Sequence, residues 1–378
     1  MCWRSWTRCR ASPPMLTYPF EDTLPPAGQA IDVAPGVRWV RMSLPLVLNH
    51  INLYLLEDDD GWWIVDTGMA LGETRELWER VFAAHLDGKP VKAVLSTHWH
   101  PDHTGLAGWL CERWQVPFYI TRTEFLTGMF YTRSSPEQIG AELEEHQQRC
   151  GRSAEDAAVV KKSMGGLRDM VSPLPCSYQR LTDGMTLPIR AHRWRVLIGR
   201  GHSPEHACLY SESLNVLISG DQVIPRISSN ISVAADEPDA NPLKEWLHSL
   251  EHFLEALPDD ALVLPAHNVP FHGLHHRLRH LIEHHEDNLL ALEEALVDTE
   301  RTAIELVPFM FHRKLTEEQV GMALGECLSH LNYLFQRGQV ARRTDAQGRF
   351  LYTSVDDTLP LRLRQRRDPK DDWQPLQV

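Results

Sequence analysis

Residues 91–105 read Val-Lys-Ala-Val-Leu-Ser-Thr-His-Trp-His-Pro-Asp-His-Thr-Gly. The first part of this stretch is mainly apolar and predicts a buried strand. The part that follows is crowded with imidazole and carboxylate groups, which are ligands that suit zinc, manganese or iron. These groups belong to His98, His100, Asp102 and His103. Because a loop that leaves a strand end can bring its side chains to one point, the stretch predicts a metal site at a sheet edge.

Other strand patterns along the chain also end in residues that can bind metal ions. The residues at these ends are Asp66, His202, Asp221 and His267. Side chains at the ends of rigid strands are held with the accuracy that a metal site demands. Together with the loop at 98–103 they supply enough ligands for two metal ions. His206 is ambiguous, since it could lie beside the metal ligands or on the surface.

The composition describes an ordinary globular protein. The chain has 378 residues, of which 43% are hydrophobic and 24% are charged. No apolar run approaches the roughly 20 residues that cross a membrane, so we expect no membrane contact. The net charge of −13 disfavours broad binding to a phosphate backbone. The seven cysteines have neither paired nor metal-type spacing, which is typical of reduced thiols in a cytoplasmic protein.

The two ends of the chain differ from the middle. The basic start has no apolar stretch behind it, so we do not expect it to be a secretory signal. We expect residues 1–20 to be a disordered leader, and either Met1 or Met15 to be the natural start. Residues 356–378 are charged and contain proline, which predicts a flexible tail.

Between these ends, residues 21–300 are predicted to form the catalytic domain. Residues 37–66 alternate between apolar and polar side chains, as antiparallel strands of a meander do. Strand patterns resume between residues 187 and 264, and a long helical pattern follows. Residues 123–178 have helical patterns instead, broken by glycine and proline. We interpret them as a helical insertion that forms a lid over the site.

Residues 301–355 are predicted to form a small winged-helix domain. Two short helices are expected first, and Thr316-Glu317-Glu318-Gln319 is a capping box that begins one of them. A third helix is expected near residues 325–337. A hairpin pattern follows around Asp345-Ala346-Gln347-Gly348. Four arginines could contact nucleic acid here: Arg337, Arg342, Arg343 and Arg349. The acidic balance of the chain favours a packing role instead, so nucleic acid is an unlikely partner.

In the order and spacing of the motifs, residues 35–290 resemble the metallo-β-lactamase superfamily. The resemblance implies an α/β fold, the αββα sandwich, in which two mixed sheets lie face to face with helices outside. It also implies a dinuclear site. The first metal would be held by His98, His100 and His202. The second would be held by Asp102, His103 and His267, with Asp221 as the bridge between the two metals.

The same resemblance implies roles for neighbouring residues and a mechanism. Asp66 would steer the histidine loop by hydrogen bonds. Two divalent ions, most simply zinc, would hold a hydroxide that attacks a carbonyl carbon or a phosphorus. Asp102 would be the catalytic residue that orients this nucleophile and takes its proton.

Three branches of the superfamily fit the motifs less well. Zinc-dependent β-lactamases lack an aspartate at the bridging position, where this chain has Asp221. Nucleases with a large inserted domain need more room than residues 222–266 provide. Flavin-linked diiron relatives replace a loop histidine by glutamate, and this chain does not. Two branches remain that the chain resembles. One is the hydroxyacylglutathione hydrolases, and the other is the β-lactamase-like protein 2 group with its C-terminal winged helix.

We therefore predict a cytoplasmic hydrolase that cleaves a small acyl ester or thioester. A homodimer is a possible assembly of this hydrolase. One alternative is a single-strand endoribonuclease of the β-lactamase-like protein 2 type. A second alternative is a mononuclear iron persulfide dioxygenase, against which the complete second set of ligands argues. Four side chains are predicted to face substrate: Phe130, Tyr131, Arg226 and Ser228.

Overall fold

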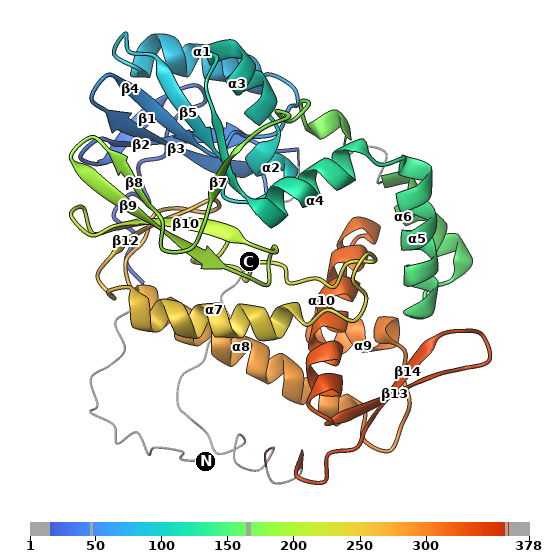
Figure 1. The fold of residues 1–378 in the computed structure, drawn as a ribbon. Coiled ribbons are helices and arrows are strands. Elements are labelled where there is room, and N and C mark those ends of the chain that lie inside the picture. The colour runs from blue at the N-terminus through green and yellow to red at the C-terminus, as the bar shows by residue number, and fades with distance from the viewer. Residues whose placement is uncertain (1–15, 46–47, 164–167, 360–361, 363–378) are drawn as a thin grey trace, which may run out of the picture.

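Two β-sheets lie face to face at the centre of the computed structural model (Figure 1). The structure describes residues 16–45, 48–163, 168–359 and 362. The first sheet has seven strands in the order β1 to β7. Its strands are β1 (Ala30–Ala34), β2 (Val37–Ser43), β3 (His50–Asp58), β4 (Gly61–Val65), β5 (Val91–Leu95), β6 (Phe118–Thr121) and β7 (Gln179–Leu181).

The first sheet is mixed. Strands β1 to β4 pair antiparallel, which confirms the predicted meander. Strands β4 to β7 then pair parallel, so that their carboxyl ends meet at one edge. The histidine loop leaves this edge at the end of β5, and the short helix α2 (Pro101–Thr104) begins within it.

The second sheet has five strands in the order β12-β11-β10-β9-β8. They are β8 (Thr186–Ile189), β9 (His192–Gly199), β10 (His206–Ser211), β11 (Val216–Gly220) and β12 (Leu262–Pro265). Strands β8 to β11 pair antiparallel and β12 pairs parallel with β11. Between the two sheets lies an apolar core that includes the fully buried Trp39, Tyr54 and Trp194. Burial of such large side chains is what holds the sheets together.

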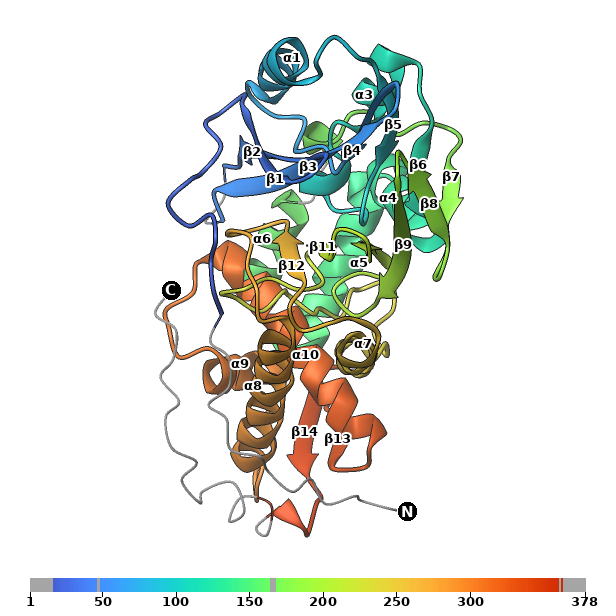
Figure 2. The same ribbon diagram turned by 90° about the vertical axis from the view of Figure 1, so that its left-hand side faces the viewer.

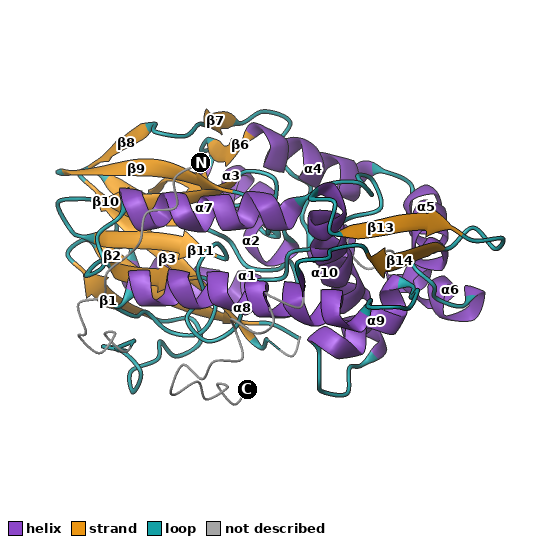
Figure 3. Cartoon of the chain, turned by 90° about the horizontal axis from the view of Figure 1, so that it is seen from below, coloured by secondary structure: helices purple, strands orange, loops and turns teal. Residues whose placement is uncertain are grey.

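Helices cover both outer faces. The first sheet is covered by α1 (Thr74–His85) and α3 (Ala107–Trp114). The second is covered by α7 (Pro242–Ala256) and α8 (Leu274–Ala295), which lie side by side across it (Figure 3). Asn241 caps α7 by accepting a hydrogen bond from the backbone N–H of Lys244, and Pro242 begins the helix. The order helix, sheet, sheet, helix confirms the predicted αββα sandwich.

The predicted insertion is helical. It contains α4 (Arg122–Arg133), α5 (Pro136–Arg149), α6 (Ala154–Ser163) and the short η2 (Arg168–Met170). After α5 the chain is anchored to the C-terminal region, because Cys150 O accepts a hydrogen bond from Ile304 N at 3.1 Å. The buried side chain of Arg152 also contacts Glu317 at 2.9 Å. The insertion is therefore attached at its far end and is a wall rather than a free flap.

The C-terminal region lies at the far end of α8 (Figure 2). It contains α9 (Ala303–Met310), α10 (Glu317–Gln336) and the hairpin of β13 (Val340–Thr344) and β14 (Phe350–Ser354). The predicted capping box and hairpin are both confirmed. The separate third helix expected near residues 325–337 is wrong, since α10 continues without a break through Gly325. A Cβ on Gly325 would lie 2.6 Å from Ser232 Oγ, so glycine serves close packing here.

The described parts of the chain ends are attached to the domain. Thr17 and His272 exchange two backbone hydrogen bonds, at 3.2 and 2.9 Å, so residues 16–20 belong to the domain rather than to the expected leader. Residues 1–15 lie outside the described part. Arg362 contacts Glu293 at 2.6 Å, and the tail beyond Arg362 is also outside it. No helix in the described ranges is long and apolar enough to cross a membrane.

Candidate metal centre

The structure brings all seven predicted ligands together at one edge of the sandwich. The first group consists of His98, His100, His202 and Asp221. Nε2 of His98 lies 2.8 Å from Nδ1 of His100 and 3.3 Å from Nε2 of His202. One ligand atom from each residue lies within 4.8 Å of all the others. Three imidazole nitrogens and a carboxylate at this spacing form a donor set that suits zinc.

The second group consists of Asp102, His103 and His267. Oδ2 of Asp102 lies 3.5 Å from Nε2 of His103 and 3.4 Å from Nε2 of His267. The residues come from both sheets, because Asp102 and His103 follow β5 while His267 follows β12. The strand ends thus assemble a second set of nitrogen and oxygen donors.

Asp221 lies between the two groups. Its Oδ2 is 3.3 Å from Nε2 of His202, and its Oδ1 is 3.4 Å from Nε2 of His267. The two buried atoms Asp221 Oδ1 and His103 Nε2 make no hydrogen bond of good geometry within the described residues. Buried polar atoms in folded proteins normally have a partner. Two such atoms at the centre of the cluster fit a site that binds a metal ion.

Three histidines present Nε2 to the cluster because oxygen atoms hold their Nδ1 atoms. Nδ1 of His202 donates to the backbone oxygen of Asn230 at 2.8 Å. Nδ1 of His267 donates to the backbone oxygen of His50, also at 2.8 Å. A hydrogen bond on one ring nitrogen fixes the tautomer and the orientation of the ring, which leaves the other nitrogen free for a metal.

Asp66 holds the third histidine as the sequence predicted. Its Oδ2 lies 2.8 Å from Nδ1 of His103, and its Oδ1 accepts a hydrogen bond from Thr97 N at 2.8 Å. The residue has a positive φ of 61° directly after β4, a conformation that aspartate tolerates better than most residues. Asp66 therefore fixes both the start of the histidine loop and the ring of His103.

Burial and mutual charge set the protonation of the ligands. Burial lowers the pKa of His100 to about 3, and the nearby His202 adds to this effect. Burial also opposes protonation of His267, but the carboxylates of Asp221 and Asp102 raise its pKa to about 10. The neighbouring histidines outweigh burial at Asp102 and lower its pKa to about 2. The site therefore holds ionised carboxylates that favour positive charge.

Glu124, at the start of α4, is a functional candidate that the sequence did not reveal. Its buried carboxylate accepts hydrogen bonds from the backbone N–H of Trp99 at 3.0 Å and of Glu205 at 2.6 Å. Burial raises the pKa of Glu124 to about 7. Trp99 lies between two ligands and Glu205 follows His202 closely, so one side chain ties together both ligand segments.

His50 and Asn52, both on β3, support the segment that carries His267. Nε2 of His50 accepts a hydrogen bond from Asn268 N at 2.8 Å. Nδ2 of Asn52 donates to Pro265 O at 2.9 Å and to Asn268 O at 3.0 Å. The segment that carries His267 is thus held on both sides by β3. The available signal in the sequence was two polar residues among the apolar side chains at the start of β3.

His206 is buried beside the cluster, which decides between the two positions open from sequence. Its Nε2 accepts a hydrogen bond from the backbone N–H of Asp221 at 3.0 Å. Its ring stacks on that of His98 at a centroid distance of 4.9 Å. His206 therefore supports two ligands at once.

Of the four predicted substrate contacts, two lie beside the histidine loop. Tyr131 stacks on Trp99 at a centroid distance of 4.8 Å, and the neighbouring Phe130 is 44% exposed. The other two have structural partners instead. Arg226 pairs with Glu21 and lies over the ring of Tyr18, and Ser228 Oγ lies 3.2 Å from Nε2 of His285. The structure gives Arg226 and Ser228 contacts that differ from the expected substrate contacts.

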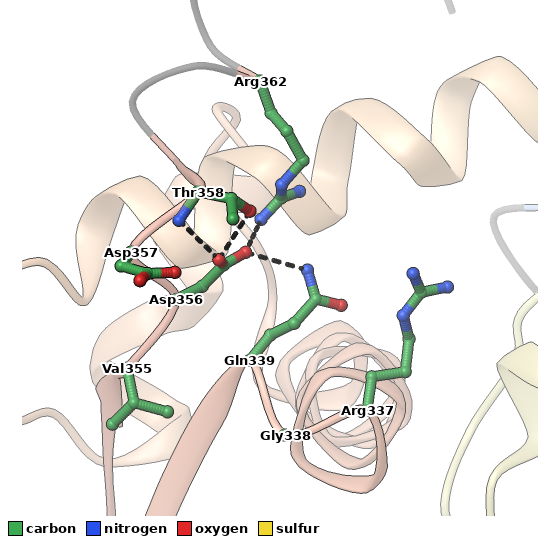
Figure 4. A pocket seen from close by; sticks show the side chains of 8 residues that line it. All are labelled: Arg337, Gly338, Gln339, Val355, Asp356, Asp357, Thr358 and Arg362. Carbon is green, nitrogen blue, oxygen red and sulfur yellow. Dashed lines mark hydrogen bonds and ion pairs between the residues drawn. The ribbon is translucent and has the colours of Figure 1, made fainter.

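A separate pocket lies beside the C-terminal hairpin (Figure 4). It is lined by Arg337, Gly338, Gln339, Val355, Asp356, Asp357, Thr358 and Arg362. Asp356 occupies its centre, where it accepts hydrogen bonds from Gln339, Thr358 and Arg362. None of the candidate metal ligands lines this pocket, and Asp356 and Arg362 within it pair with one another.

The fold and the cluster together define the class of the protein: a metal-binding hydrolase built on two stacked mixed sheets. Residues 47–267 match the model of the metallo-beta-lactamase superfamily, and the chain belongs to this superfamily. Residues 289–355 match the metallo-beta-lactamase-like C-terminal domain. The second match covers the end of α8, α9, α10 and the hairpin.

Solved structures and a curated relative agree with this assignment. A beta-lactamase domain protein from Burkholderia ambifaria has a TM-score of 0.83 and 44% identity, over 90% of this chain and 98% of that one. A metallo-beta-lactamase family protein from Thermus thermophilus has a TM-score of 0.71 and 29% identity, over 85% and 100%. The probable metallo-hydrolase YqjP of Bacillus subtilis is 21% identical over 309 residues, 78% of this chain and 91% of the relative.

Proposed function

We propose that the protein is a dinuclear zinc hydrolase that cleaves a small acyl ester or thioester. The position of Asp221 carries this proposal, since its two carboxylate oxygens face ligands of different groups at 3.3 and 3.4 Å. A persulfide dioxygenase with a single iron would use only the first group. The buried and well-oriented second group therefore favours two metal ions over one.

Each residue around the metal centre would have its own role in hydrolysis. Bound divalent ions lower the pKa of a coordinated water towards ~7 and polarise the oxygen of the bond to be cleaved. Oδ2 of Asp102 lies 3.5 Å from Nε2 of His103 and 3.4 Å from Nε2 of His267, and the low pKa of Asp102 keeps it ionised at neutral pH. We assign it the role of orienting the attacking water and accepting its proton. Glu124, Asp66 and His206 hold the ligands in place.

An apolar wall beside the histidine loop favours a substrate with an apolar acyl part. Tyr131 of α4 stacks on Trp99 with an angle of 11° between the rings, and Trp99 in turn contacts His100. The exposed Phe130 and Leu126 lie on the same helix. Such a surface binds a hydrocarbon chain by burial rather than by hydrogen bonds. The anchored insertion would thus select the acyl group.

Nucleic acid fits the described surface less well. The four arginines of the proposed winged helix each have a partner within the chain: Arg337 contacts Tyr333, Arg342 contacts Asp239, Arg343 contacts Glu300, and Arg349 contacts Asp345. An arginine that is already paired is less available to a phosphate, and the net charge of −13 adds repulsion. We therefore propose that the C-terminal region serves packing.

The test is metal analysis of the wild type beside Asp221→Ala, with hydrolysis of a thioester, a lactone and a single-stranded RNA. Asp59→Ala is the matched control, because Asp59 lies in an exposed turn. We expect about two zinc ions per chain, and turnover of the thioester or lactone that falls by about a hundredfold or more in Asp221→Ala only. One iron per chain, or cleavage of RNA alone, would overturn the proposal.

A further inference from the structure

We propose that helix α10 of the C-terminal region positions the metal ligand His202, through Asn230 and Glu326. The inference rests on the proposed metal centre and goes beyond it, because it gives the second domain a part in metal binding. Glu326 lies on α10, in the region that matches the C-terminal domain, and none of the motifs includes it.

Three consecutive residues connect two metal ligands to the C-terminal helices. The backbone oxygen of Asn230 accepts the Nδ1–H of His202 at 2.8 Å. Ser229 Oγ donates to the backbone oxygen of Asp221. Ser228 Oγ donates to Nε2 of His285 on α8, at 3.2 Å. The orientation of the His202 ring therefore depends on where the segment 228–230 is held.

Helix α10 holds this segment through several contacts. Nδ2 of Asn230 donates to Oε2 of the buried Glu326 at 3.1 Å and to Met322 O at 3.3 Å. Val233 N donates to Gly325 O at 3.1 Å. A side chain at Gly325 would collide with Ser232, although glycine destabilises a helix interior relative to alanine. Close contact between α10 and the segment explains why a glycine stands there.

A second route of hydrogen bonds ends at the same residue of α10. Nδ1 of His330 lies 2.8 Å from Glu326 O, so it donates and leaves Nε2 as an acceptor. Nδ1 of His285 lies 3.1 Å from that Nε2 and donates to it. Nε2 of His285 then accepts from Ser228. Both ends of the segment 228–230 are thereby fixed relative to Glu326, one by its side chain and one by its backbone.

A metal-bound histidine is oriented by the hydrogen-bond partner of its other ring nitrogen. Loss of that partner typically weakens metal binding by about 10- to 100-fold. We therefore expect that loosening Asn230 or Glu326 weakens the first metal group, which contains His202. The second group of Asp102, His103 and His267 has its own supports, Asp66 and His50, and is expected to keep its affinity.

The experiment is a Co²⁺ titration of the metal-free protein, followed by visible absorption and by competition with a chelator. The variants are Asn230→Ala, Glu326→Ala and Glu326→Gln. We expect about tenfold weaker binding of one of the two Co²⁺ equivalents in both alanine variants, with the other equivalent unchanged. Glu326→Gln should restore wild-type binding, because its amide oxygen can still accept the hydrogen bond from Asn230.

Ser329→Ala is the matched control on the same helix. Ser329 is fully buried, and its hydroxyl has no hydrogen-bond partner within the described residues. If Glu326→Ala fails to fold, Asn230→Ala carries the test, since the side chain of Asn230 is only partly buried. Wild-type affinity of both equivalents in Asn230→Ala would overturn the inference. A wild type that binds no Co²⁺ at all would instead overturn the proposed metal centre, and this inference with it.

Discussion

Oδ2 of Asp66 lies 2.8 Å from Nδ1 of His103, and both atoms are buried. The carboxylate follows β4, the imidazole follows β5, and these strands are parallel neighbours in the first sheet. Because β4 and β5 are paired, Asp66 is held beside His103 and orients its ring. Nε2 of His103 is left pointing at the cluster, where it makes no hydrogen bond of good geometry among the described residues.

We expect Asp66→Asn to weaken the second metal by about 10- to 100-fold. Asparagine tolerates the positive φ at this position, so the backbone is preserved. Asparagine has only one side-chain oxygen, however, so it cannot accept from both Nδ1–H of His103 and Thr97 N. Either the ring of His103 or the start of the histidine loop loses its partner. Chelator competition measures the affinity. Equal affinities of Asp66→Asn and wild type would show that His103 needs no such partner.

Glu124→Gln is expected to weaken metal binding by about tenfold, even though the side chains have nearly the same shape. The carboxylate accepts from two backbone N–H groups, of Trp99 and Glu205. The amide can accept from only one of them and turns a donor towards the other. Glu255→Gln, at an exposed position on α7, is the control. The same affinity in both variants would contradict the role of Glu124.

Tyr131→Ala should raise KM for a thioester with a long acyl chain and change KM little for a short one. The ring lies on Trp99 at 4.8 Å and supplies apolar area, worth roughly 1 to 3 kcal/mol when buried. Tyr131→Phe keeps the stacked ring and loses only the hydrogen bond to Asp236, so it should behave as the wild type. Steady-state kinetics with both substrates provides the measurement, and an equal rise in KM for both would refute the proposed acyl wall.

The sequence could predict the ligands because metal binding demands particular side chains. His98, His202 and Asp221 stand at strand ends in a fixed order, and few other residue types could replace them. Glu124 and Asn230 left no such trace. The carboxylate of Glu124 accepts from a distant backbone group, Glu205 N, and Asn230 holds the ring of His202 with its own backbone oxygen. Any segment supplies backbone groups of this kind. Only the fold shows which backbone groups they reach.

Two features that local patterns did not indicate have the same origin. Gly325 suggested the start of a new helix, yet α10 runs through it because the contact with Ser232 leaves no room for a side chain. Arg226 follows the metal motif closely and was expected at the substrate, yet it pairs with Glu21 from the start of the chain. Local patterns predict helices and strands well. Packing between distant segments decides where a glycine is tolerated inside a helix and where a long side chain points.

The stability of the metal-free protein should fall below about pH 6.5, partly because of His330. Burial lowers the pKa of His330 to about 4. Burial also lowers the pKa of His285, and the neighbouring His330, His284 and Arg277 add to this effect. In the unfolded chain a histidine has a pKa of about 6.5. The folded state therefore binds fewer protons, and stability falls as pH drops from about 6.5 towards 4, by up to about 1.4 kcal/mol per pH unit for each histidine.

Urea unfolding with a chelator present, at about pH 7 and about pH 5, measures this loss. His330→Gln removes one titrating group while its amide can still donate and accept. We expect the variant to lose less stability than the wild type over the same interval. An identical pH dependence in the two proteins would mean that His330 is not a source of the loss.

Removal of the metals should lower Tm strongly, because the ligands join the two sheets. His98 and His103 follow the first sheet, while His202 and His267 belong to the second. A metal present at about 1,000 times its Kd adds about 4 kcal/mol to the stability of the folded state. For a chain of this size that corresponds to a change in Tm of about 5 °C for each metal.

Thermal unfolding of the wild type before and after chelation tests this, with Asp221→Ala as the comparison. Asp221 faces both groups, so its removal should weaken both metals and reduce the effect of the chelator. If chelation lowered Tm equally in both proteins, the stabilising ion would have to bind elsewhere, because a site without its bridging carboxylate cannot retain full affinity.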